Sequence, residues 1–74
     1  MIKELDAVVL VRDLPDQGLK PGDLGTVVFV HKNSAAYEVE FTTLAGDTIA
    51  VETLKADAIR PVHDDEIAHV RQVA

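Results

Sequence analysis

Residues that could do chemistry gather near the end of the chain. The segment His63-Asp64-Asp65-Glu66 is followed by His69, and on a helix Asp65 and His69 would share one face, four residues apart, as metal ligands can. His63 and His69, six residues apart, would lie on different faces, and a run of acids is also typical of a helix N-terminus. The pattern therefore favours a charged, solvated helix start, and we expect no metal site here.

Two other pairings have the residue types of catalytic groups. His31 and Ser34 are three residues apart, but both fall in a turn signal and no third orienting group is near them in sequence. Glu38 and Glu40 would lie on the outward face of one strand, about 7 Å apart, where carboxylates are normally solvated. The chain also has no cysteine, and so no thiolate nucleophile. We expect no enzyme, no cofactor and no small-molecule substrate.

The glycine-rich segment runs from Lys20 through Pro21-Gly22-Asp23 to Gly25. Glycine-rich loops cradle anions through backbone N–H groups, most effectively where a helix N-terminus follows. Here the following residues read as a strand, so the segment predicts a corner at which Gly25 allows the chain to enter that strand.

Composition limits the partners as well. The chain has 74 residues, enough for one domain, and a net charge of -6, which repels phosphate backbones and anionic lipid at long range. Its basic residues are scattered singly rather than clustered: Lys3, Arg12, Lys20, Lys32, Lys55, Arg60 and Arg71. Nucleic-acid binding is therefore disfavoured, and it would need Lys20, Lys32 and Arg60 to converge in space.

The first residues predict the compartment. Charges at Lys3, Glu4 and Asp6 interrupt any apolar run, so we expect no signal peptide. The longest apolar stretch, Ala7 to Val11, is too short to cross a bilayer. A bacterial protein of the cytoplasm, without a membrane segment, is the expectation.

Alternating and β-branched runs predict strands over 7–11, 25–31, 36–41 and 48–52, with a last short one starting at Ile59. In the third of these, Tyr37, Val39 and Phe41 would face the core; in the fourth, Ile49 and Val51 would do so. The expected fold is all-β: a small five-stranded antiparallel SH3-like barrel with a long first loop and a short C-terminal helix or tail. The barrel would span 1–62 and the helix or flexible tail 63–74.

Several motifs carry a resemblance to a known family: Leu5-Asp6-x-Val8-Val9-Leu10, Asp13-Leu14-Pro15, Gly22-Asp23-x-Gly25-Thr26-Val27, Tyr37-Glu38-Val39-Glu40-Phe41 and Ile59-Arg60-Pro61. Over Leu5 to about Val62 the chain resembles the domain of unknown function 4926 family, small prokaryotic proteins, and the resemblance implies an SH3-like barrel rather than an activity. The segment from Gly22 to Val27 also resembles the glycine-valine core of KOW modules, which occur in ribosomal proteins and transcription elongation factors.

The strand over 25–31 is the most informative for function. Strict alternation would place Val27 and Phe29 on one face and Val28 and Val30 on the other, so one apolar pair must look outward. An outward Phe29 would be covered by the C-terminal segment or left as a contact patch. The candidate partner-binding residues are Leu19, Lys20, Val27, Phe29 and His31.

These observations favour a non-catalytic accessory module that binds a protein, through the loop from Asp13 to Asp23 and the outward side of the second strand. Three alternatives stay open: a KOW-like RNA or ribonucleoprotein contact, an acidic antitoxin or inhibitor of a basic partner protein, and self-association of the chain as a homodimer.

Overall fold

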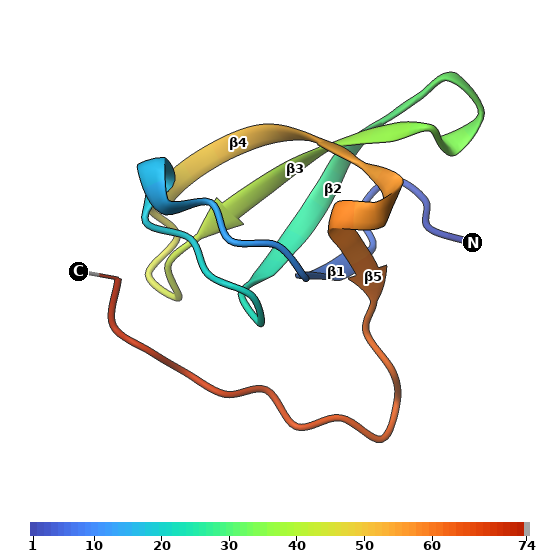
Figure 1. Ribbon diagram of the computed structural model, residues 1–74. Coiled ribbons are helices and arrows are strands. Elements are labelled where there is room, and N and C mark those ends of the chain that lie inside the picture. Colours follow the sequence, from blue (N-terminus) through green and yellow to red (C-terminus); the bar gives the residue numbers. More distant parts are fainter. Residues whose placement is uncertain (74) are drawn as a thin grey trace.

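The computed structural model describes residues 1–73 as one strongly bent sheet with an extended C-terminal tail (Figure 1). The described residues form five strands: β1 (Ala7–Leu10), β2 (Leu24–His31), β3 (Ala36–Thr42), β4 (Thr48–Lys55) and β5 (Ile59–Pro61). Three single 3₁₀ turns lie between them: η1 (Pro15–Gln17), η2 (Lys32–Ser34) and η3 (Ala56–Ala58). The expectation of an all-β, five-stranded antiparallel fold is confirmed.

The strand order across the sheet is β4-β3-β2-β1-β5, and all neighbours are antiparallel. Short turns connect β2 to β3 and β3 to β4, whereas β5 returns to pair with β1. Within the described chain β4 and β5 are the two edges, so backbone hydrogen bonds do not close the sheet into a barrel.

The core fills the concave side of the bent sheet. It consists of buried apolar side chains from every strand, the first loop and η3: Val8, Leu10, Leu19, Val27, Tyr37, Val39, Phe41, Leu54, Ala58 and Ile59. Tyr37, Val39 and Phe41 are all buried, as the alternation of β3 predicts. Gly25 lies opposite Val8 in the β1–β2 pair, with no room beneath it for a side chain.

Strand β2 contains a bulge that changes the face of its second half. Val27 lies opposite Val39, but Phe29 lies opposite Glu38, so Val28 is an extra residue on β2. Val27 is therefore fully buried, whereas Phe29 keeps 49% of its surface exposed. The prediction that Val27 and Phe29 share one face is wrong, because the extra residue breaks the alternation.

A second bulge has the same effect in β4. Phe41 pairs with Ala50 and Thr42 with Thr48, which leaves Ile49 as the extra residue. Ile49 and Ala50 both pack against the core, and Val51 turns outward with 52% of its surface exposed. The prediction that Val51 points inward is therefore wrong. Strand β4 also continues to Lys55, three residues beyond its predicted end.

The long first loop folds back on itself. Leu14 and Leu19 exchange backbone hydrogen bonds of 3.0 and 3.1 Å around η1, and Gly18 closes that turn with a left-handed φ of 72°. Leu19 enters the core and Leu14 packs against it. The loop is thereby fixed by its own hydrogen bonds and apolar contacts.

The C-terminal segment 62–73 forms a tail rather than the alternative helix. A segment of this length is a marginal helix on its own, and ion pairs hold this one against the sheet at two points. Arg60 pairs with Glu66 at the start of the tail, and Arg71 pairs with Asp23 near its end. Over residues 1–73 there is no helix with the length and apolar character needed to span a membrane.

Candidate functional site

The structure separates the five predicted partner-binding residues into three places. Leu19 and Val27 are buried in the core, so their side chains face no partner in this fold. Lys20 is exposed in the first loop, before β2 begins. Phe29 and His31 lie together on the outer face of β2, and this pair is the centre of the candidate site.

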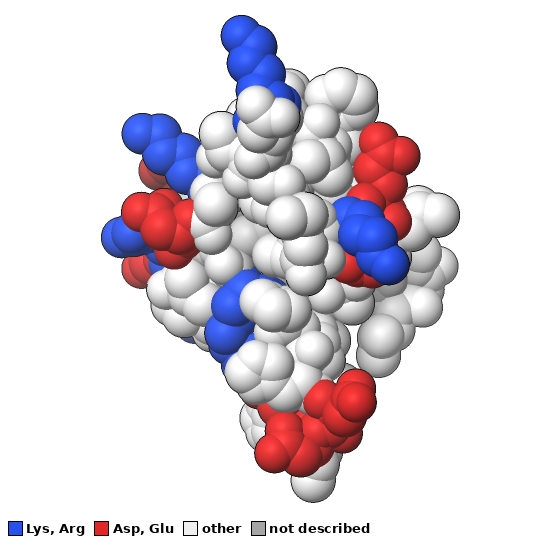
Figure 2. All heavy atoms as spheres, turned by 90° about the vertical axis from the view of Figure 1, so that its right-hand side faces the viewer, with Lys and Arg blue, Asp and Glu red and all other residues white. Residues whose placement is uncertain are grey.

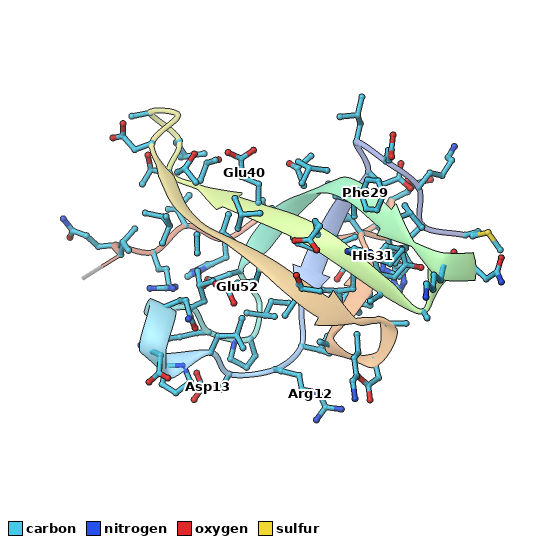
Figure 3. The ribbon with its side chains drawn as sticks, turned by 90° about the horizontal axis from the view of Figure 1, so that it is seen from above. Arg12, Asp13, Phe29, His31, Glu40 and Glu52 are labelled. Carbon is cyan, nitrogen blue, oxygen red and sulfur yellow. The ribbon has the colours of Figure 1, made fainter. Side chains whose placement is uncertain are left out.

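The two rings of this pair pack edge to face. Their centroids are 4.9 Å apart and their planes make an angle of 71°, the geometry that aromatic quadrupoles favour (Figure 3). Phe29 and His31 are two residues apart beyond the bulge, so the pleat places them on the same face. The Phe29 ring is thus held by one neighbour and remains half exposed.

A carboxylate orients the His31 ring. His31 Nε2 donates to Glu38 Oε2 at 2.6 Å, and Thr53 Oγ1 donates to the same oxygen at 2.7 Å. The bonds from His31 and Thr53 hold the pKa of Glu38 below its ordinary value, so the carboxylate is ionised at neutral pH. Both hydrogen bonds end on the same oxygen of the Glu38 carboxylate. The hydrogen bond to Glu38 fixes the orientation of the His31 ring.

The N-terminal segment brings another exposed apolar residue to the bulge of β2. The Leu5 amide donates to the Val27 carbonyl at 2.7 Å, which places Leu5 next to the bulge at Val28. Leu5 has a φ of 72° and leaves 80% of its surface exposed. A left-handed conformation costs a leucine roughly 1 kcal/mol, and such strain is concentrated at functional sites. We call Leu5, Val28, Phe29 and His31 the outer patch.

Polar side chains border the outer patch along β3 and β4. Glu38 and Glu40 face outward as predicted, and Glu40 Oε2 accepts a hydrogen bond from Thr48 Oγ1 at 2.8 Å. Figure 3 shows Glu40 on this side of the sheet and Glu52 on the opposite side, toward the first loop. A half-exposed apolar centre with hydrogen-bonded polar neighbours is the usual composition of a protein interface.

The three basic residues required for an RNA contact do not converge. Lys20 precedes β2 and Lys32 follows it, so the eight residues of this strand, about 25 Å, lie between them. Arg60 is on β5 and its guanidinium is bonded to Glu66. On the face shown in Figure 2, basic side chains stand apart from one another, and acidic ones lie at both sides and at the lower end.

The acidic-histidine segment near the C-terminus is used for structure. Glu66 accepts two hydrogen bonds from Arg60 and one from the His63 amide. These bonds lower the pKa of Glu66 to about 2, and the hydrogen bonds from Arg60 make the largest contribution. Among residues 1–73, no three histidine or acidic side chains are grouped so as to hold a metal ion.

Two side-chain pairs, His31–Glu38 and Arg71–Asp23, were not predicted from the sequence. The His31–Glu38 pair follows from the β2–β3 hairpin register, which the turn at Lys32–Ser34 could have indicated. The pair between Arg71 and Asp23 joins residues 48 positions apart, and no local pattern marks it.

Comparison with known proteins gives one match. No curated protein and no solved structure matches the chain at a significant level. A family model described as Domain of unknown function (DUF4926) matches residues 4–61, a range that contains β1 to β5 and all four residues of the outer patch. The chain therefore belongs to the DUF4926 family.

Proposed function

We propose that this protein is a non-catalytic binding module that takes a protein partner on the outer patch. The observation that carries the proposal is the half-exposed Phe29 ring, fixed edge to face against His31 on a rigid sheet. Aromatic side chains of this kind are enriched at the centres of interfaces, because they bury a large apolar area at a small cost in conformational entropy.

The surroundings of Phe29 support this function. Leu5 and Val28 extend the apolar area, and the strained turn at Leu5 holds that side chain in solvent instead of against the core. The ordered Glu38 carboxylate supplies a hydrogen-bond acceptor beside it. A partner with an apolar centre and donor groups at its edge would complement the patch.

The SH3-like description of the fold belongs to this proposal as well. The strand order is β4-β3-β2-β1-β5, and the tail runs past Leu24 at the start of β2 rather than past its other end, where Phe29 and His31 lie (Figure 1). Small barrels of this type present loops and strand faces around a small core.

Affinity capture from the native cells, followed by titration of the purified partner, tests the function. We expect the wild-type chain and a Val51→Asp control to retain the partner, and Phe29→Asp to weaken its binding by at least about 30-fold. Val51 is a suitable control because it is half exposed on the same outer face, two strands away.

The mass of the free protein identifies self-association. If light scattering shows twice the monomer mass and Phe29→Asp restores the monomer, the partner is a second copy. If Phe29→Asp leaves every interaction and the mass unchanged, the outer patch has no binding role.

A further inference from the structure

The loop before β2 builds an acceptor site for a guanidinium group. Arg71 Nε donates to Asp23 Oδ1 at 2.8 Å, and Arg71 Nη2 donates to Asp23 Oδ2 at 2.5 Å and to the Gly18 carbonyl at 2.9 Å. The Lys20 amide donates to Asp23 Oδ2 at 2.8 Å and so fixes the carboxylate. Three acceptors in this arrangement match the planar fork of arginine better than the point charge of lysine.

This acceptor site belongs to the sheet and its loop rather than to the tail. Asp23 and Gly22 are tied to the body by backbone bonds, from the Leu10 amide to Asp23 O at 2.9 Å and from the Gly22 amide to Leu10 O at 2.8 Å. Gly18 is fixed by the η1 turn. Within residues 62–73 the structure shows one backbone–backbone hydrogen bond, from the Glu66 amide to the His63 carbonyl, and it joins two residues of the tail itself. The tail is therefore an occupant of a site formed without it.

The tail fills that site incompletely. A cavity of about 410 Å³ remains between it and an apolar wall formed by Leu19, Leu24, Phe41, Leu44 and Ile49. A second space of about 330 Å³ lies on the side of Val9 and Val62. Ala68 lines both cavities, and the small alanine side chain leaves them open. Meanwhile the larger Ile67 is 94% exposed to solvent.

We propose that this groove is a binding site for an extended segment of a partner protein that carries an arginine and, three residues before it, a large apolar side chain. The arginine takes the place of Arg71 against Asp23 and Gly18, and the apolar side chain fills the space that Ala68 leaves. The tail of the chain itself occupies the groove when the partner is absent and competes with it. The Asp23 carboxylate supplies the negative charge that the arginine of such a segment complements. This site is separate from the outer patch, and either proposal can fail without the other.

Fluorescence anisotropy with labelled twelve-residue peptides tests the proposal on the full chain. The probes are the sequence of residues 62–73 and the same peptide with Leu in place of Ala68. In the Arg71→Ala protein, whose own tail has lost its anchor, we expect the leucine peptide to bind at least about tenfold tighter than the alanine peptide. Wild-type protein binds both more weakly, because its tail competes.

Two matched changes isolate the acceptor site. Asp23→Asn in the Arg71→Ala protein is expected to weaken leucine-peptide binding at least about tenfold, whereas Asp16→Asn, the same charge change elsewhere in the loop, leaves it unaltered. Replacing the peptide's arginine by glutamine has the effect of Asp23→Asn and cannot disturb the fold of the protein. Equal affinities for the two peptides, or binding indifferent to that arginine, would overturn the proposal. So would a wild-type dimer that Arg71→Ala converts to a monomer, since a second copy's tail would then be the occupant.

Discussion

Phe29 faces solvent although Val27, two residues earlier on the same strand, is completely buried. The bulge at Val28 produces this relationship, since it inserts one residue into β2 without a counterpart on β3. Before the bulge, β2 places Val27 in the core; after it, the strand presents the aromatic ring of Phe29 on the outer face.

The two positions should respond differently to truncation. Val27→Ala removes two buried carbons and leaves a cavity, so we expect the free energy of unfolding to fall by about 2 kcal/mol. Phe29→Ala, despite removing more atoms, should cost about 1 kcal/mol or less because half the ring is already in water. Urea unfolding monitored by circular dichroism measures both. A larger loss for Phe29→Ala than for Val27→Ala would place the ring in the core.

The bulge at Ile49 makes a similar prediction for β4. Val51→Thr should change the free energy of unfolding by less than about 0.5 kcal/mol, because the side chain lies on the outer face. Val39→Thr, the same substitution at a fully buried position of β3, should cost about 2 kcal/mol by burying an unpaired hydroxyl. Equal costs at the two positions would show that β4 keeps the uninterrupted alternation.

Gly25 should be intolerant of any side chain. A Cβ added there would lie 2.5 Å from Val39 Cγ1 and 2.9 Å from Phe41 Cε1, and both of those side chains are fixed in the core. We expect Gly25→Ala to destabilise the fold by about 1–3 kcal/mol through overpacking. Thr26→Ala, at the exposed next position, is the control and should have little effect in the same thermal melts. An unchanged melting temperature for Gly25→Ala would contradict the close approach.

The Arg60–Glu66 pair should titrate in acid. Its hydrogen bonds lower the pKa of Glu66 from 4.5 to about 2, so the ionised form is favoured when the pair is made. The contribution of the pair is complete above about pH 4.5 and is lost as the pH falls toward 2. The His63 amide donates to Glu66, so the NMR chemical shift of the His63 amide proton should follow the titration of Glu66, with a midpoint near pH 2. Arg60→Gln should raise that midpoint. A midpoint unchanged by Arg60→Gln would show that the pair does not form.

Much of the fold could be predicted because its signals are local. The alternation over Tyr37, Val39 and Phe41 matches the buried face of β3, and the apolar run Val8–Leu10 matches a strand buried on both sides. Gly46 takes a positive φ, which glycine adopts readily, in the hairpin between β3 and β4. Each of these features depends on a few neighbouring residues.

The errors arise where structure depends on distant partners. A bulge depends on the register with another strand, so nothing in Val27-Val28-Phe29 alone indicates which residue is extra. The tail could not be assigned for the same reason: Arg71 reaches Asp23 from the other end of the chain. Of the candidate site, Phe29 and His31 could be found from residue type and turn position, whereas Leu5 and Glu38 required the fold.

The most direct test of the outer patch is photo-cross-linking in living cells from a benzoylphenylalanine placed at position 29. The account requires a covalent adduct with one protein species, absent when the same group is placed at position 51, two strands away on the same face. Labelling that is equally strong from positions 29 and 51, or no adduct from position 29, would show that the exposed aromatic ring of β2 is not a binding surface.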